Sequence, residues 1–238
     1  MEKIENLRIK IFADGAEKDS MLNMYENPVI KGLTTNPSLM RKAGIKNYKA
    51  FCNDILTEIK KKPISFEVFT DDIGEMKRQA FEIASWGENV YVKIPVSNTK
   101  QQFCYDLIKE LTNKKVKVNV TALMTVKQVI NTVNSLDPKV PSYVSVFAGR
   151  IADTGIDPLP LMSASVEILK FSPAAELIWA SPREVLNIFQ AESIGCQIIT
   201  VTKDIIKKLS SVGYNLDEFS LDTVKMFYKD ATDAGFSL

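Results

Sequence analysis

The sequence of 238 residues predicts a single (β/α)8 barrel with a C-terminal helical extension. Eight short runs rich in β-branched residues alternate with segments whose apolar residues recur at helical spacing, a pattern typical of parallel strands covered by helices. The glycine fingerprints GxGxxG and GxxxxGK are absent, and the first strand continues into Ala13-Asp14-Gly15-Ala16-Glu17. These absences count against the alternative, a doubly wound open sheet. We expect one domain over residues 1–238, in which 210–238 form a helical tail outside the barrel.

The expected strands are short apolar runs, because a barrel strand is covered on both faces. Each run is only strand-sized, and a segment with helical spacing follows it. In chain order the expected strands are Arg8–Gly15, Ile30–Pro37, Ile64–Phe69, Val90–Val96, Lys117–Leu123, Tyr143–Arg150, Glu176–Pro182 and Cys196–Val201.

The expected helices place apolar residues three and four positions apart, so that one face of each helix packs on the barrel. A short first helix precedes the second strand, and a last one lies in the tail. In order they are Glu17–Tyr25, Tyr48–Lys61, Ile73–Ser85, Lys100–Thr112, Val126–Ser135, Pro158–Lys170, Arg183–Ile194, Lys203–Leu209 and Leu221 to about Ala234.

The composition excludes several classes of function. Lys and Arg (30) nearly balance Asp and Glu (29), so no overall field recruits nucleic acid or anionic membrane. The absence of histidine excludes Ser-His-Asp and Cys-His nucleophiles and imidazole metal ligands. Cys52, Cys104 and Cys196 show no CxxC spacing and are expected to be small apolar residues, buried or half-buried, without a zinc site or a disulfide framework. The N-terminus has no apolar signal core, and no apolar run is long enough to span a membrane. We therefore expect a cytoplasmic protein that binds neither nucleic acid nor membrane.

Polar side chains occur late in seven of the eight expected strands. In a (β/α)8 barrel the C-terminal strand ends carry the active site, whereas the opposite ends serve stability. A polar group within a covered strand is costly unless it is paired or functional. The sequence therefore predicts a site at this rim. The seven residues, in strand order, are Asp14, Asn36, Glu67, Lys93, Thr121, Arg150 and Ser181.

Lys93 is the most informative of these residues. It lies in Val90-Tyr91-Val92-Lys93-Ile94-Pro95-Val96, where it is the only charged residue. Buried lysines are rare without a function, and desolvation lowers the pKa of an amine so that it can attack a carbonyl. The sequence therefore favours a Schiff-base nucleophile. The alternative is a lysine whose ammonium group reaches the rim or pairs with a carboxylate.

Two carboxylates can move protons around such an amine. Imine formation and C–C cleavage both require proton transfer, and without histidine this task falls to acids. Glu67 lies one strand away from Lys93 and is the first candidate, while Asp14 is the second. Different surroundings can give two such acids different pKa values and different roles. A purely structural ion pair with Lys93 or Arg150 is the alternative for each.

Two arginines near the end of the barrel indicate a phosphate site. Arg150 is expected to end the sixth strand, and Arg183 to open the helix directly behind Ser181-Pro182. Guanidinium groups, backbone N–H groups and the positive end of a helix all favour an anion. An ordinary surface arginine is the alternative for Arg183.

Five segments, in order along the chain, resemble the transaldolase family. The resemblance extends from about Ile11 to Leu209 and includes that family's two signature segments, on strands two and four. The segments are Thr34-Thr35-Asn36-Pro37, Val92-Lys93-Ile94-Pro95, Asn119-Val120-Thr121-Ala122-Leu123, Val144-Ser145-Val146-Phe147-Ala148-Gly149-Arg150-Ile151 and Trp179-Ala180-Ser181-Pro182-Arg183.

The resemblance implies a (β/α)8 enzyme that needs neither metal nor cofactor and moves a dihydroxyacetone unit between sugar phosphates. It implies that Lys93 forms the imine and that Asp14 and Glu67 transfer protons. Asn36 would hold the carbinolamine and substrate hydroxyls, and Thr121 would fix a water together with Glu67.

The resemblance also implies a set of binding residues. Ser145 would contact the dihydroxyacetone end, Thr35 and Phe147 would belong to the substrate site, and Asn119 would orient its neighbours. The expected phosphate ligands are Arg150, Ser181 and Arg183. The expected partners are sugar-phosphate substrates and further copies of the same chain.

The chain resembles the short fructose-6-phosphate aldolase branch in length, yet differs from it in the site. That branch typically has Gln in place of Glu67 and Tyr in place of Phe147. Gly15 and Pro182 also depart from the family pattern, in which a hydroxyl residue and Phe are usual. A transaldolase is therefore the first hypothesis. The alternatives are an aldolase-like enzyme, a relative acting on another keto-sugar, and a sugar-phosphate-binding barrel without activity.

Overall fold

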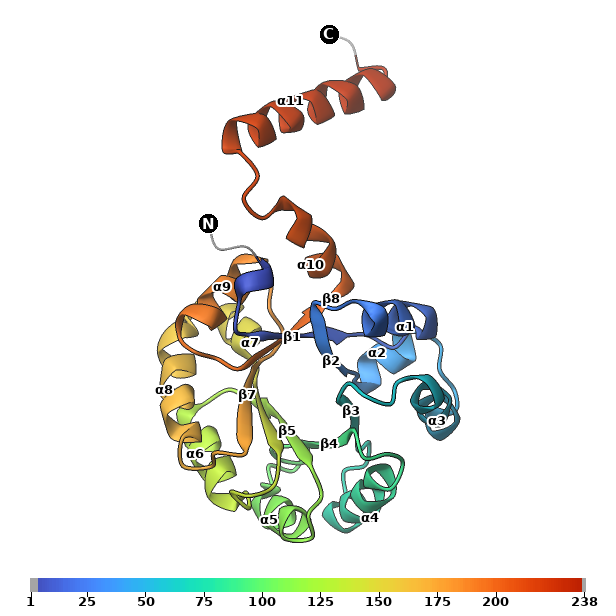
Figure 1. The fold of residues 1–238 in the computed structure, drawn as a ribbon, viewed down its shortest axis with the longest axis vertical. Coiled ribbons are helices and arrows are strands. Elements are labelled where there is room, and N and C mark those ends of the chain that lie inside the picture. The colour runs from blue at the N-terminus through green and yellow to red at the C-terminus, as the bar shows by residue number, and fades with distance from the viewer. Residues whose placement is uncertain (1–3, 237–238) are drawn as a thin grey trace.

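The centre of the structure, a computed structural model that describes residues 4–236, is a closed barrel of eight parallel strands in chain order (Figure 1). The first strand pairs with the last, with Phe12 opposite Thr200, and so closes the ring. The predicted (β/α)8 fold is confirmed. The strands are β1 (Lys10–Asp14), β2 (Ile30–Thr34), β3 (Ile64–Glu67), β4 (Val90–Pro95), β5 (Val118–Leu123), β6 (Ser142–Val146), β7 (Ala175–Trp179) and β8 (Ile198–Thr202).

Helices surround the barrel and cover the outer faces of its strands (Figure 1). Two short 3-10 helices, η1 (Ile4–Asn6) and η2 (Leu209–Ser211), flank this arrangement. The α-helices are α1 (Lys18–Glu26), α2 (Pro37–Lys42), α3 (Tyr48–Glu58), α4 (Ile73–Ala84), α5 (Tyr105–Asn113), α6 (Val126–Ser135), α7 (Ala148–Ala152), α8 (Leu159–Leu169), α9 (Leu186–Ser193), α10 (Lys203–Lys208) and α11 (Leu216–Asp233).

Strands two and six are shorter than the sequence predicts, because each gives way to a short helix. Asn36 accepts a hydrogen bond from the Leu39 amide at 2.9 Å and caps α2, whose first residue is Pro37. Proline suits that position because its missing N–H would be unpaired there anyway. After β6, Arg150 lies in α7 rather than at the end of a strand. Both side chains still follow the C-terminal ends of their strands.

Several further boundaries differ from expectation. Strand β7 ends at Trp179, and α9 begins at Leu186 rather than at Arg183. Helix α5 begins at Tyr105 instead of Lys100, since the preceding segment forms a turn closed by a bridge between Ser97 and Phe103. Helix α11 begins earlier than expected, at Leu216, where the Asn215 side chain accepts from the amides of Asp217 and Glu218.

Large apolar side chains form the floor of the barrel interior. The rings of Tyr91 and Tyr143 stack with centroids 4.0 Å apart, and Phe12 meets Tyr143 edge-on at 5.6 Å. Ile178 and Ile198 complete this buried cluster. Side chains two residues apart on a strand point to the same face. The residues two positions beyond these floor residues therefore also point inward and form the next layer. They are Asp14, Lys93, Ser145, Ala180 and Thr200.

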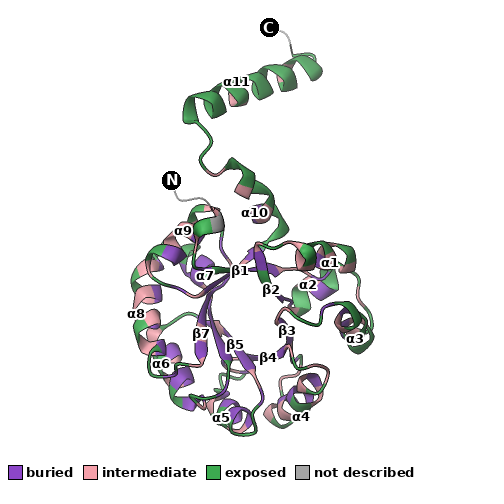
Figure 2. Cartoon of the chain, in the orientation of Figure 1, coloured by how far each residue is buried: buried purple, intermediate pink, exposed green. Residues whose placement is uncertain are grey.

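Helix α11 lies apart from the barrel and is exposed along its length, as Figures 1 and 2 show. None of its residues is buried. Its exposed large side chains include Leu216, Phe219, Phe227 and Tyr228. Over the part of the chain that the structure describes, no helix combines the length and the apolar character needed to cross a membrane.

Candidate active site

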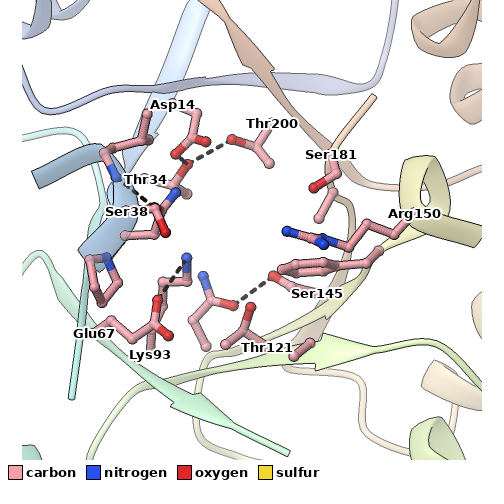
Figure 3. Close-up of a pocket in the computed structure, with 17 residues that line it drawn as sticks. Asp14, Thr34, Ser38, Glu67, Lys93, Thr121, Ser145, Arg150, Ser181 and Thr200 are labelled. Carbon is pink, nitrogen blue, oxygen red and sulfur yellow. Dashed lines mark hydrogen bonds and ion pairs between the residues drawn. The ribbon is translucent and has the colours of Figure 1, made fainter. Parts of the chain in front are cut away.

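A cavity of about 460 Å³ opens at the C-terminal ends of the strands (Figure 3). It is lined by every residue that the sequence predicts for the site except Thr35 and Arg183. Thr34, Ser38 and Thr200 also line it, and these were not predicted. The predicted residues that line it are Asp14, Asn36, Glu67, Lys93, Asn119, Thr121, Ser145, Phe147, Arg150 and Ser181.

Lys93 lies at the base of this cavity and is only 7% exposed. Its Nζ donates a hydrogen bond to the carbonyl of Thr35 at 2.9 Å and is 3.4 Å from Glu67 Oε2. The register of the sheet places Glu67 on one side of Lys93 and Asn119 on the other. Thr35 therefore contributes its carbonyl to the site, while its buried hydroxyl bonds to the carbonyl of Ser65.

Burial raises the pKa of both Glu67 and Asp14 above their ordinary values. The Lys93 cation opposes this rise in both cases, and a hydrogen bond from Thr34 opposes it at Asp14. The charge of Asp14 raises the pKa of Glu67 further. Carboxyl groups with raised pKa values hold a proton more readily near neutral pH, which is what acid–base chemistry requires.

Two threonines support Asp14. Thr34 Oγ1 donates to Asp14 Oδ1 at 2.9 Å, and Thr34 and Thr200 share a 2.7 Å hydrogen bond between their hydroxyls (Figure 3). Because Thr34 has a single proton and gives it to Asp14, Thr200 is the donor of the second bond. Thr200 lies two residues beyond Ile198 on β8, so the alternation along the last strand could have revealed it.

A buried polar chain runs beside Lys93. Ser145 Oγ donates to Asn119 Oδ1 at 2.7 Å, and Asn119 Nδ2 donates to Ser65 Oγ at 3.0 Å. The amide of Asn119 is thereby fixed between β3 and β6, an arrangement suited to orienting neighbours. Ser65 was not predicted, although it lies on the same face of its strand as Glu67, two residues earlier.

Thr121 on β5 and Asn36 after β2 both line the cavity. Thr121 Oγ1 is buried and has no hydrogen-bond partner within residues 4–236. Buried polar groups are nearly always satisfied, so this hydroxyl is suited to a water or a substrate oxygen in the cavity. The Oδ1 atom of Asn36 already accepts the α2 cap bond, which fixes the direction of its amide.

Arg150 and Ser181 face one another at the far side of the cavity (Figure 3). The Arg150 guanidinium carbon lies 5.7 Å from the centre of the Phe147 ring, which supports it by a cation–π contact. Ser181 has a positive φ of 57°. Ser181 is the second residue after the end of β7, and in this left-handed conformation it lines the cavity.

Arg183 does not join Arg150, contrary to the predicted guanidinium pair. It is exposed and forms an ion pair with Asp153, with Nε 2.8 Å from Oδ1 and a second contact from Nη2. Its Nη1 donates to the carbonyl of Ser181 at 3.1 Å. Because the helix begins only at Leu186, Arg183 belongs to the loop. In this structure it links that loop to the end of α7 instead of lining the cavity.

The fold and the site define a class of protein, namely (β/α)8 barrels that hold a buried lysine among acidic and hydroxyl side chains at the barrel mouth. A model of the transaldolase/fructose-6-phosphate aldolase family matches residues 11–238. The chain belongs to this family.

Curated relatives cover nearly the whole chain. A protein of Dehalococcoides mccartyi called a probable transaldolase is 32% identical over 202 residues, 84% of this chain and 90% of the relative. A probable transaldolase of Thermoanaerobacter sp. is 30% identical over 224 residues, 94% and 98% of the two chains. Both relatives thus match well over two thirds of this chain and of their own length.

Proposed function

We propose that this protein is a transaldolase, which transfers a dihydroxyacetone unit from a ketose phosphate to an aldose phosphate through a Schiff base on Lys93. One observation supports this proposal above all. The buried amine of Lys93 lies 3.4 Å from the carboxylate of Glu67, in a cavity that also contains Asp14 and the guanidinium of Arg150. A binding barrel has no need of a buried amine beside two acids.

In the proposed reaction the neutral amine attacks the ketose carbonyl, and loss of water from the carbinolamine gives the imine. Asp14 then takes the proton of the hydroxyl next to the C–C bond that breaks, and the aldose leaves. The electron pair of the broken C–C bond remains in an enamine on Lys93. Addition of the enamine to a second aldehyde and hydrolysis of the imine complete the transfer. Glu67, with a water held by Thr121, serves the proton transfers of imine formation and hydrolysis.

The phosphate of the sugar would bind at the far side of the cavity. Arg150 and Ser181 supply a guanidinium and a hydroxyl there. The proposed donors of the dihydroxyacetone unit are sedoheptulose 7-phosphate and fructose 6-phosphate. The proposed acceptors are glyceraldehyde 3-phosphate and erythrose 4-phosphate. Sugar phosphates are charged and do not cross membranes, so we also propose a cytoplasmic location.

Trapping with borohydride tests the proposal. Incubation with fructose 6-phosphate and sodium borohydride is expected to reduce the imine to a stable secondary amine on the peptide that contains Lys93. The mass of that peptide then increases by that of dihydroxyacetone minus water plus two hydrogens. Lys93→Met is expected to give no adduct, because it has no amine at this position. Lys10→Met is the matched control, since this exposed lysine lies on the opposite end of β1. Absence of an adduct on the wild-type protein contradicts the proposal.

A kinetic comparison separates the two activities in the family name. A transaldolase is expected to consume fructose 6-phosphate only when an acceptor aldehyde is present, whereas an aldolase releases dihydroxyacetone without one. Consumption without acceptor favours the aldolase. Binding of sugar phosphate without trapping or turnover identifies a non-catalytic barrel.

We also propose that the protein forms a homo-oligomer in which α11 packs on a second copy of the chain. Leu216, Phe219 and Phe227 follow helical spacing along one side of α11, and all three are at least half exposed. Lys225 and Lys229 occupy the opposite side. The helix lies away from its own barrel (Figure 2), so a neighbouring subunit is the partner that would cover its apolar side.

Substitution on α11 tests this arrangement. Wild-type protein is expected to have a mass in solution that is a multiple of 26.7 kDa. The variant Phe219→Asp/Phe227→Asp is expected to be smaller, because two charges would be buried in the interface. Lys229→Asp, on the polar side, is the control and is expected to keep the wild-type mass. A monomeric wild-type protein in light scattering contradicts the proposal.

A further inference from the structure

The backbone of Glu67 lies where the seam between β2 and β3 opens. The two strands pair only at Leu33 with Ile64 and Thr34 with Ser65. The last bond across this seam runs from the Thr35 amide to the Ser65 carbonyl, at 3.2 Å. Beyond it the chain of β2 turns away into α2. The amide and carbonyl of Glu67 point to the same side as those of Ser65, because backbone groups alternate along a strand. They consequently have no strand to pair with.

The hydroxyl of Tyr48 takes the place of the missing strand. Tyr48 Oη donates to the carbonyl of Glu67 at 2.9 Å and accepts from the amide of Glu67 at 2.8 Å. One side chain thus satisfies both backbone groups of the residue whose carboxylate lies beside Lys93. Tyr48 is the first residue of α3, and the Asn47 side chain caps that helix by accepting from the Ala50 amide at 3.0 Å.

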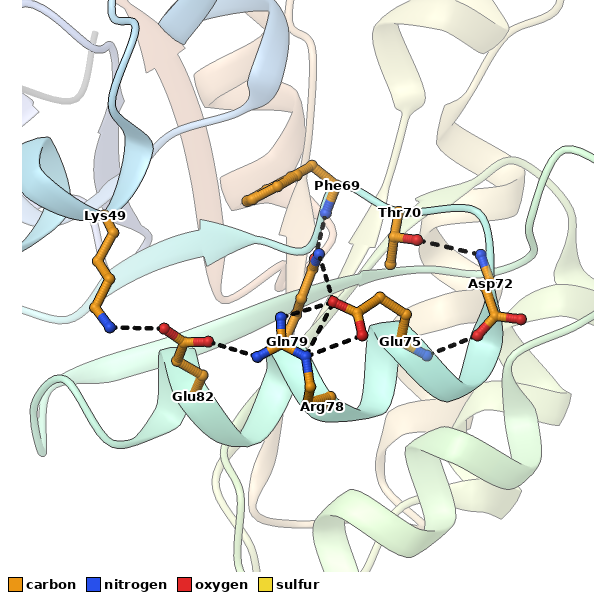
Figure 4. Close-up of polar contacts among 8 residues, drawn as sticks. All are labelled: Lys49, Phe69, Thr70, Asp72, Glu75, Arg78, Gln79 and Glu82. Carbon is orange, nitrogen blue, oxygen red and sulfur yellow. Dashed lines mark hydrogen bonds and ion pairs between the residues drawn. The ribbon is translucent and has the colours of Figure 1, made fainter.

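Neighbouring groups hold Tyr48 and the chain after Glu67 in place. The Tyr48 ring packs against Phe69 and Trp86, with centroids 5.0 and 6.2 Å away. The Phe69 amide donates to Gln79 Oε1 on α4 at 3.0 Å (Figure 4). Burial raises the pKa of the Tyr48 phenol, so its hydroxyl stays protonated as a donor. The end of β3 is therefore fixed by side chains from two helices.

We infer that Tyr48 is a positioning residue for Glu67, which it keeps within reach of Lys93 without touching the substrate itself. This inference rests on the proposed function of Glu67 in proton transfer. Tyr48 does not line the cavity of the site; it lines an apolar groove on the other side of Pro37. If its hydroxyl is lost, the backbone at Glu67 is free to shift and water can reach the carboxyl group.

The variant Tyr48→Phe tests the inference, since it keeps the ring and removes the hydroxyl. We expect kcat to fall about 10- to 100-fold, the usual effect of a small displacement of a reacting group. We also expect the limb of the pH–rate profile that belongs to Glu67 to move to lower pH. The reason is that access of water reduces the burial that raises the pKa of Glu67. Trapping on Lys93 is expected to persist.

Asn89→Ala is the matched control. Like Tyr48, Asn89 makes two side-chain hydrogen bonds to the backbone, but at the opposite end of the barrel. Its Nδ2 donates to the carbonyls of Ile59 at 2.8 Å and Lys62 at 2.9 Å. It is expected to lower stability without moving the pH limb. A purely structural role for Tyr48 predicts the same behaviour for Tyr48→Phe, and that result overturns the inference.

Hydrogen exchange on the wild-type protein gives a second test that does not depend on folding of a variant. The Glu67 amide is expected to exchange slowly because it donates to Tyr48 Oη. Exchange at the rate of an unprotected amide overturns the inference. A different result would overturn the proposed function itself, namely the absence of any borohydride adduct on Lys93 of the wild-type protein.

Discussion

Glu67→Gln is expected to lower kcat for the transfer reaction about 10²- to 10⁴-fold, the usual contribution of a positioned acid–base group. The amide has nearly the same shape as the carboxyl group, so it can keep a contact with Lys93, but it cannot accept or release a proton. Formation of the carbinolamine remains possible, and we expect slow trapping on Lys93 to persist. The measurement is steady-state kcat with fructose 6-phosphate and an acceptor aldehyde.

The same variant is expected to change how stability depends on pH. Burial raises the pKa of Glu67 in the folded protein above its ordinary value of about 4.5. The folded state therefore binds the proton more tightly than the unfolded state, and the free energy of unfolding falls as pH rises from about 4.5 through the raised pKa. Glu67→Gln lacks this group, so its stability relative to wild type is expected to increase with pH over that range. Urea unfolding at several pH values measures the difference.

Glu88→Gln is the control for both effects, because Glu88 is exposed and lies two residues before β4, away from the cavity. It is expected to keep the wild-type kcat. An unchanged kcat in Glu67→Gln excludes a role of this carboxylate in proton transfer. A stability difference from wild type that falls with pH contradicts the raised pKa.

The sequence predicts the centre of the site well because strand periodicity decides it. The alternation along β4 fixes the direction of Lys93, and the same argument applies to Glu67 on β3 and Asp14 on β1. Each of these residues lies in an apolar run with no competing local structure. Their convergence then follows from the (β/α)8 topology, in which all C-terminal strand ends meet at one rim.

Predictions were less successful where the chain leaves a strand. Asn36 and Arg150 were placed in strands, whereas a cap at Asn36 and the short helix α7 end those strands earlier. Arg183 was expected in the phosphate site, yet it pairs with Asp153 from a different loop. Tyr48 was not predicted as part of the site at all. Tyr48 bonds to the backbone of Glu67, where β2 no longer pairs with β3. No pattern in the sequence marks a contact between a side chain and an unpaired backbone group.

Of the glycines, Gly149 makes the closest approach to a neighbouring backbone, and it lies beside the proposed phosphate site. A Cβ atom at this position would lie 1.5 Å from the carbonyl oxygen of Ser181. The approach is held by a hydrogen bond from the Gly149 amide to the Ala180 carbonyl, at 3.3 Å. The obstructing atom belongs to the backbone, and Ser181 already has a left-handed φ of 57°. Neither side of this contact can therefore yield without moving α7 or the end of β7.

Gly149→Ala is accordingly expected to lower the free energy of unfolding by about 1–3 kcal/mol, the usual cost of overpacking. For a chain of this size that loss corresponds to a Tm lower by about 2–4 °C for each kcal/mol. Arg150 follows Gly149 directly, so the displacement also moves the guanidinium relative to Ser181. We expect KM for phosphorylated sugars to increase more than KM for dihydroxyacetone.

Gly15→Ala provides the comparison, because a Cβ atom at Gly15 meets no atom within 4 Å. Its backbone also does not require a positive φ, so alanine can adopt the same conformation. We expect Gly15→Ala to unfold at or slightly above the wild-type temperature. If Gly149→Ala has the same Tm and the same KM values as wild type, the contact between α7 and Ser181 does not hold Arg150 in place, and the phosphate site must be built from other groups.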